Sequence, residues 1–295
     1  MADSLITQVS YPQAIPETDN RTTISNEDPL PTILNFNLRG RPFRIARDIL
    51  ISLPESLLIA MFPHGLAISP SDDSSSFASM EEPVYYVDYN PDCLEFVLRF
   101  LHSTNAEFAD ERSMREDILL ASRALGDTEA LSPIQYQLLT KQAVIVLREE
   151  LEFYALPPKH FPGQHAYTIN ELKLQCGERL VQQKQIFTPL ERNINKEGNM
   201  AEQHLIDMLC QSGYSRNDHW NHRALEPRRT CIMSMALSKL ETESEQGYLP
   251  TAQKMLLFWK KPARKCWWEG SGVEVGRLAI RVWCRRTWTL ELTLL

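Results

Sequence analysis

The sequence lacks long apolar runs and has little glycine, and each shortage excludes a class of protein. No window approaches the ~18 uncharged apolar residues of a membrane-spanning helix, so no transmembrane segment is expected. Only 11 of the 295 residues are glycine, and the glycine-rich signatures of dinucleotide-binding and P-loop proteins are missing. The serine-hydrolase elbow and the paired-histidine zinc motif are missing as well. We therefore predict a non-enzymatic protein with no catalytic residue, cofactor or metal.

The N-terminus and the cysteines both indicate an intracellular protein. The residues from Met1 to Ser4 lack the basic and apolar regions of a secretory signal. Six cysteines in 295 residues follow no disulfide spacing, so we expect reduced thiols. A cytoplasmic location is predicted; the alternatives are the nucleus and the plasma-membrane periphery, reached through a partner.

The net charge of −7 is unevenly distributed along the chain. Residues 1–165 hold 24 acidic and 12 basic side chains, which gives −12, and residues 166–295 hold 14 and 19, which gives +5. The negative total argues against a nucleic-acid partner. The basic C-terminal part favours an acidic protein partner instead.

Hydrophobic patterning predicts an α+β protein with two domains. The first is a small sheet flanked by helices, and the second is a smaller α+β domain with an antiparallel C-terminal sheet. The predicted segments are a disordered arm at 1–32, the first domain at 33–156 with an acidic loop at 69–83 and a helical insertion at about 103–142, a linker at 157–167, and the second domain at 168–295.

Local periodicity and capping signals place the elements within these domains. Strands are predicted at 33–38, 43–45, 84–88, 255–259, 278–283 and 288–294. Helices are predicted from Pro54, from Asn90, from Ser113, from Ser132 to Tyr154, and at 169–185, 199–213 and 233–241.

A basic, tryptophan-rich segment is the main candidate for binding a client. Its candidate residues are Trp259, Lys260, Lys261, Arg264, Lys265, Trp267 and Trp268. Interleaved cations and aromatics suit a phosphorylated or acidic peptide, an anionic membrane surface or single-stranded nucleic acid, and the net charge favours the acidic protein. The structural alternative, which carries slightly more weight, is a hairpin with tryptophans in the core and lysines in solvent.

Two other groups of side chains favour structural roles. Cys266 follows two cations that would activate a thiol, but it also fits an ordinary strand position, and it is the only nucleophile an enzyme hypothesis can name. Four potential zinc ligands lack the C-x-x-C knuckle of a structural site, which favours a core cysteine and surface histidines. These four are Cys210, His219, His222 and Cys231.

The first domain carries a series of short motifs whose members are Phe36, Gly40, Phe43, Pro54, Ser56, Leu57, Met61, Phe62, Asp88 and Phe100. Together they resemble the potassium-channel-tetramerisation type of BTB/POZ domain, and residues 149–154 resemble its closing helix. The resemblance implies a BTB/POZ-like fold and, by analogy of fold, a homo-oligomer. Arg39 and Tyr89 depart from the family's glycine and arginine, so its standard tetramer interface is not implied.

Three further segments, at 199–210, 259–268 and 288–292, resemble a fungal branch similar to the yeast Whi-type growth-regulation proteins, which activate phosphatases. This resemblance implies an adaptor that recruits a phosphatase in stress-response and growth or nutrient signalling. Related BTB proteins are substrate adaptors of cullin-RING ubiquitin ligases, and this is the alternative function. In either case the second domain is expected to hold an acidic client.

Overall fold

The computed structural model of the chain describes residues 31–65, 83–124, 141–156, 168–197, 200–241, 255, 259 and 261–295. For 108–124 and 196–197 the description covers the backbone alone. Nearly all of the predicted arm and of the acidic loop lie outside these residues, as do the predicted linker and the helix start at Ser132. No helix in the described part of the chain is both long and apolar enough to cross a membrane.

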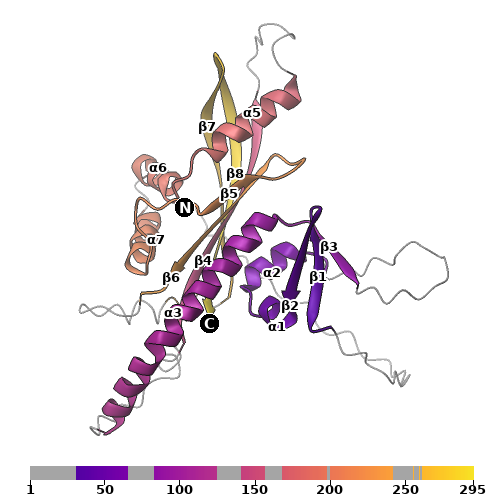
Figure 1. The fold of residues 1–295 in the computed structure, drawn as a ribbon. Coiled ribbons are helices and arrows are strands. Elements are labelled where there is room, and N and C mark those ends of the chain that lie inside the picture. Colours follow the sequence, from indigo (N-terminus) through magenta and orange to yellow (C-terminus); the bar gives the residue numbers. More distant parts are fainter. Residues whose placement is uncertain are drawn as a thin grey trace, which may run out of the picture.

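The N-terminal layer is a three-stranded sheet with helices on one side (Figure 1). Its elements are β1 (Ile33–Leu38), β2 (Arg41–Ala46), α1 (Arg47–Ile51), α2 (Glu55–Met61), β3 (Val84–Val87) and α3 (Pro91–Ala124). Strand β1 pairs antiparallel with β2 and parallel with β3. The β1–β2 turn places Arg39 and Gly40 at φ values of 51° and 93°, as the tight turns of β-hairpins require. The predicted hairpin and third strand are confirmed.

The second layer is a five-stranded antiparallel sheet in the order β5-β6-β4-β8-β7. Its strands are β4 (Ala143–Leu156), β5 (His222–Leu225), β6 (Cys231–Lys239), β7 (Ala263–Val275) and β8 (Leu278–Leu294). Its helices are α5 (Ile169–Val181), α6 (Thr188–Glu197) and α7 (Met200–Gln211). The predicted α+β class and the antiparallel C-terminal sheet are confirmed, as are the helices at α5 and α7.

Two predicted helices are wrong, because they are the central strands of the large sheet. Residues 143–154 form most of β4, which pairs with β6 and β8, and residues 233–239 belong to β6. Residues 143–149 are all buried because both faces of the sheet are covered there. A strand buried on both faces shows no alternation in sequence, and its pattern is then easily mistaken for a buried helix.

The C-terminal predictions also need correction. The hairpin predicted at 259–268 is wrong, because 263–275 is one continuous strand and the turn lies at Gly276, with φ of 60°. The two strands predicted at 278–294 are the single strand β8. Met255 and Trp259, which were expected in a strand, are helical. The helix predicted to begin at Ser113 is a continuation of α3.

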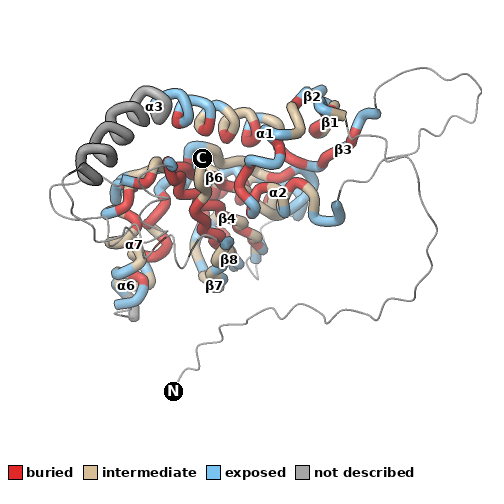
Figure 2. The backbone as a smooth tube through the Cα atoms, turned by 90° about the horizontal axis from the view of Figure 1, so that it is seen from below, coloured by how far each residue is buried: buried red, intermediate tan, exposed pale blue. Residues whose placement is uncertain are grey.

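The large sheet has two different faces. We call the side against α5, α6 and α7 the helix face, and it carries the hydrophobic side chains of Ile145, Leu147 and Leu151. The other side, which we call the open face, begins under the N-terminal layer with Val144 and Val146. Figure 2 shows that buried residues concentrate in β4 and β6, where the layers meet. The predicted domain boundary near 156 stays a prediction, although β4 pairs with strands from beyond it.

The carboxylate of Glu291 joins the two layers. It lies on the open face of β8 and accepts hydrogen bonds from the backbone N–H groups of Glu55 and Ser56, at 2.7 and 2.9 Å. These groups begin α2, whose own N-cap residue, Pro54, offers no side-chain acceptor. The sheet therefore caps a helix of the N-terminal layer and fixes its position.

Candidate protein-interaction surface

Strand β7 divides the predicted client-binding residues between the two faces of the sheet. Successive side chains of a strand point to opposite faces. Lys265 and Trp267 therefore point to the helix face, and Arg264 and Trp268 point to the open face. The basic, aromatic segment is not one surface, and its two halves have different surroundings.

On the helix face, Trp267 is partly buried and packs against the core. Its ring packs edge-to-face on Trp288 at 5.6 Å between centroids. Lys265 and Arg286 lie over the same ring, at 5.5 and 5.9 Å from its centroid. Lys265 also donates to the buried carboxylate of Glu202 at 2.7 Å. These contacts support a structural role for both Lys265 and Trp267.

The remaining predicted residues do not extend the surface. Trp259 packs against the same cluster as Trp267. Lys261 precedes β7 and is exposed. Lys260 lies outside the described residues. The structure thus leaves Arg264 and Trp268 as the predicted residues that face the open side of the sheet.

Three aromatic rings stand in a row on the open face. Trp268 lies between Tyr154 of β4 and Trp283 of β8, with centroids 6.2 Å from each and interplanar angles of 26° and 21°. Tyr154, Trp268 and Trp283 are 48%, 50% and 45% exposed, and we call these three residues the aromatic ladder. Tyr154 and Trp283 were not predicted from sequence. The sequence does hold a signal for Trp283. It lies between Arg281 and Arg285 in an alternating strand, so it shares their solvent-facing side.

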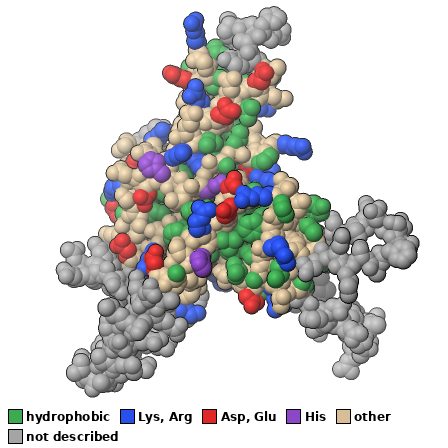
Figure 3. Space-filling model, in the orientation of Figure 1, with side chains coloured by type: hydrophobic (Ala, Val, Ile, Leu, Met, Phe, Trp, Pro, Cys, Tyr) green, Lys and Arg blue, Asp and Glu red, His purple; other side chains and the backbone are tan. Residues whose placement is uncertain are grey.

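Arginines surround the aromatic ladder. Arg285 pairs with Glu152 at 2.9 Å. Arg264 and Arg281 are exposed and make no ion pair with the described part of the chain, and Glu274 near the hairpin turn is likewise unpaired. In Figure 3, hydrophobic side chains lie among charged ones in the upper part, where β7 and β8 extend beyond the N-terminal layer. Exposed aromatic rings beside unpaired arginines are typical of the centre of a protein interface.

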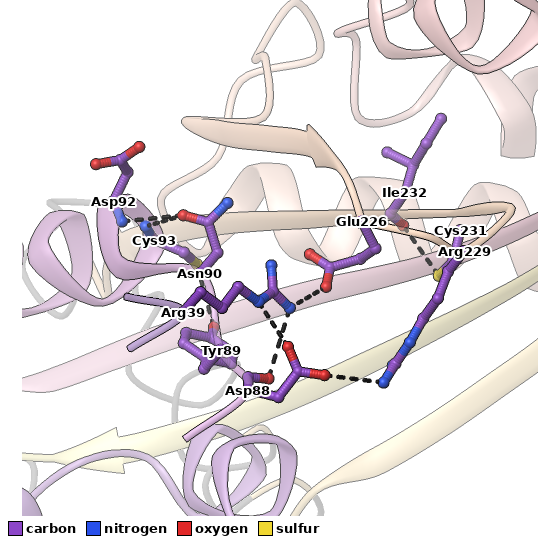
Figure 4. Close-up of polar contacts among 10 residues, drawn as sticks. All are labelled: Arg39, Asp88, Tyr89, Asn90, Asp92, Cys93, Glu226, Arg229, Cys231 and Ile232. Atoms are coloured by element: carbon purple, nitrogen blue, oxygen red, sulfur yellow. Dashed lines mark hydrogen bonds and ion pairs between the residues drawn. The ribbon is translucent and has the colours of Figure 1, made fainter. Parts of the chain in front are cut away.

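Between the ladder and the N-terminal layer the open face is hollowed into a cleft of about 360 Å³. Figure 4 shows the polar contacts that cross it. Arg39 donates to Asp88 at 2.7 Å and to the carboxylate of Glu226, and Arg229 pairs with Asp88 at 3.1 Å. These contacts tie the β1–β2 turn and the residue after β3 to the β5–β6 connection. The cleft is therefore held by ion pairs between the two layers.

Two thiols and a histidine that line the cleft have pKa values shifted by burial. Burial raises the pKa of the Cys93 thiol to about 12. Burial, together with neighbouring glutamates, raises that of Cys231 to about 12. Burial lowers the pKa of His222. At neutral pH both thiols are protonated, and a protonated thiol is a weak nucleophile.

A buried ionic cluster on the helix face was missed by sequence reasoning. Glu149 is fully buried and pairs with Arg223 and Arg286, and it accepts a hydrogen bond from the Trp288 indole at 3.0 Å. Arg286 pairs in turn with Glu269 at 2.6 Å. Burial alone would raise the pKa of Glu149, but the two arginines lower it to about 2. The cluster separates the hydrophobic core under α5 from the core under α6 and α7.

The four potential zinc ligands are not brought together. Cys210 packs with the helix-face core, whereas His222 and Cys231 line the cleft on the opposite side of the sheet. Throughout the described ranges, no three His, Cys, Asp or Glu side chains are grouped to hold a metal ion.

Comparison with known proteins finds relatives among fungi. The chain is 34% identical to the WHI2-like protein P4H10.16c of Schizosaccharomyces pombe, over 93% of this chain and 96% of that protein. It is 28% identical to a growth regulation protein of Saccharomyces cerevisiae, over 76% of this chain but only 55% of the longer relative. An uncharacterised S. pombe protein, C20H4.08, is 25% identical over 93% of this chain. No family model matches the chain.

Proposed function

Because the chain belongs to the WHI2-like family of fungal proteins, we propose that it is a non-enzymatic adaptor that recruits a phosphatase in growth, nutrient and stress signalling. The growth-regulatory part of this role agrees with the name of the S. cerevisiae relative, a growth regulation protein. The adaptor role, the phosphatase and the BTB/POZ character of the N-terminal layer belong to the proposal.

The aromatic ladder is the observation that carries the adaptor role. Solvent exposure of three stacked rings costs free energy that burial against a partner would recover, at roughly 25 cal/mol per Å² of apolar surface. Aromatic anchors beside arginines also account for most of the affinity in many protein interfaces.

The chemistry of the cleft supports a binding role over a catalytic one. Its thiols have raised pKa values, and Arg39 is paired with Asp88 and with Glu226 across the layers. General acid–base or nucleophilic catalysis needs a group that can change protonation near neutral pH, or an activated nucleophile. We therefore assign the cleft and the ladder to recognition.

Affinity purification of the full chain from a fungal lysate, followed by mass spectrometry, tests the proposal. We expect a phosphatase catalytic subunit to be enriched and to be lost with Trp268→Ala. The matched control is Tyr86→Ala, which removes a 70% exposed aromatic residue from β3 of the N-terminal layer and should leave the phosphatase bound.

A cullin ligase adaptor is the second candidate. It is favoured by the N-terminal layer, whose β2-β1-β3 sheet and helices carry the BTB-like motifs. If a cullin and its RING partner are enriched without a phosphatase, and Tyr86→Ala rather than Trp268→Ala removes them, then the phosphatase proposal is wrong. Phosphate release by the purified chain itself, abolished by Cys266→Ser, would contradict the non-enzymatic role.

A further inference from the structure

Strand β7 forms one edge of the large sheet. It runs for 13 residues from Ala263 to Val275, pairs with β8 on one side, and contains no proline. On its other side, none of its backbone groups hydrogen-bonds to the described part of the chain. A long edge that no described strand covers offers a row of N–H and C=O groups to an added strand.

The aromatic ladder stands beside this edge, and two glycines of β7 make it accessible. Gly270 lies under the Trp283 ring, since a Cβ there would come within 3.2 Å of that ring. At Gly272 a Cβ would meet nothing within 4 Å, so the open face is notched next to Arg281. A strand that pairs with β7 would therefore contact side chains of β8 as well.

From these features we propose that β7 accepts an extended, acidic segment of a partner protein as a sixth strand of the sheet. This inference rests on the proposed adaptor function and specifies the chemistry of its partner. Main-chain hydrogen bonds along β7 fix the register, and the aromatic ladder receives an apolar side chain at the centre of the segment.

The spacing of the two unpaired arginines defines the segment further. Arg264 and Gly272, which pairs with Arg281, lie eight residues apart on β7, or ~26 Å at the rise of a strand. Trp268 lies midway between them, and all three positions are on the open face. A matching segment of about nine residues has acidic side chains at its first and ninth positions and a large apolar one at its fifth, all on one side of the strand.

Charge argues against a second copy of this chain as the occupant. If two β7 strands paired antiparallel about Trp268, Arg264 of each copy would lie opposite Gly272 of the other, beside Arg281. Each end would then hold two unpaired arginines against one carboxylate, that of Glu274 on the same open face, and this excess of like charge is destabilising. An acidic partner removes this repulsion at both ends of the strand.

Fluorescence anisotropy with a synthetic nine-residue peptide tests the proposal on the full chain. The peptide carries glutamate at both ends, tryptophan at the centre and threonine or valine elsewhere, and the comparison peptide has lysine at both ends. We expect the acidic peptide to bind at least tenfold more tightly than the basic one. Trp268→Ala should weaken its binding at least tenfold, and the double variant Arg264→Glu, Arg281→Glu should reverse the preference.

Lys184→Glu is the matched control, since Lys184 is exposed and lies outside the sheet. It should leave peptide binding unchanged. Hydrogen exchange measured by mass spectrometry should show new protection of residues 263–275 in the complex. Protection at β2 or β3 instead, equal binding of the two peptides, tighter binding of a thymidine dodecamer, or a dimer of the free chain by analytical ultracentrifugation would each overturn the proposal.

The outcomes separate this inference from the adaptor proposal. If the phosphatase co-purifies through Trp268 but the acidic peptide does not bind, the adaptor stands and strand addition is wrong. If the variants change peptide binding as expected but no phosphatase is enriched, then β7 is a docking strand and the phosphatase proposal is wrong.

Discussion

The two faces of the large sheet use neighbouring residues of the same strands for opposite purposes. On the helix face, Trp267 packs against core side chains, and Arg286 is buried among paired charges. One residue along each strand, Trp268 and Arg285 lie on the open face with about half of the tryptophan in solvent. The same residue types thus serve the fold on one side and remain available to a partner on the other.

The difference lies in how completely each face satisfies its charges. On the helix face, Glu149 has two arginine partners and an indole N–H, and burial makes each of these contacts strong. On the open face, Arg264 and Arg281 have no carboxylate among the described residues. The helix face therefore pairs its buried charges within this chain, whereas the proposed function leaves the arginines of the open face to a partner.

Removal of the Glu149 carboxylate should have the largest effect. Glu149→Ala leaves Arg223 and Arg286 buried and without their shared partner, and breaking a buried ion pair in this way costs about 3–5 kcal/mol. The loss should appear as a lower free energy of unfolding in urea denaturation. On the open face, Glu152→Ala breaks the half-exposed pair with Arg285 and should cost only about 0–1 kcal/mol. Equal losses would mean that the faces do not differ as proposed.

Low pH should weaken the helix face in a similar way. The pKa of Glu149 is about 2 in the folded protein, against 4.5 for an unperturbed glutamate. Its stabilising effect is therefore complete above about pH 5 and is lost as the pH falls toward 2, by about 3 kcal/mol in total. Urea denaturation of the wild type and of Glu149→Gln between pH 6 and pH 2.5 measures this. The two stabilities should converge as the pH falls, and parallel curves would contradict the assignment.

The two adjacent tryptophans give a smaller and sharper contrast. Trp267→Ala should lower the free energy of unfolding by about 2–3 kcal/mol, because the partly buried ring packs against the helix-face core. Trp268→Ala loses two stacking contacts at a half-exposed site and should cost about 1 kcal/mol. Binding should respond in the reverse order, with the acidic peptide lost only in Trp268→Ala. Thermal melts and anisotropy on the same two variants provide the comparison.

The sequence was most informative where one face of an element is solvated. The alternation of Leu34, Phe36 and Leu38 with asparagines predicted β1, and the helical period predicted α5 and α7. Strands β4 and β6 were mistaken for helices because other elements cover both of their faces, so polar and apolar residues do not alternate along them. The position of β4 between β6 and β8 depends on pairings more than 70 residues apart in the chain, and no local pattern contains these.

The candidate surface was half predicted for a related reason. The basic, aromatic composition of β7 drew attention to Trp268, but its interpretation as a hairpin grouped Trp267 with it. A continuous strand places the two on opposite faces. The partners of Trp268, Tyr154 and Trp283, come from strands whose pairing only the fold shows.

The cysteines of the β7–β8 hairpin test the same contrast with the smallest perturbation. Cys266 is exposed on the open face, whereas Cys284 is buried on the helix face, where burial raises its pKa to about 11. Iodoacetamide at pH 8 should therefore modify Cys266 before Cys284, and peptide mapping by mass spectrometry measures this. Cys266→Ser should change the free energy of unfolding by no more than about 0.5 kcal/mol. Because Cys266 lies between Arg264 and Trp268 on the open face, its modification should weaken binding of the acidic peptide without loss of stability. Faster modification of Cys284 would mean that the helix face of the hairpin opens in solution, and the division between a closed face and an open face would then fail.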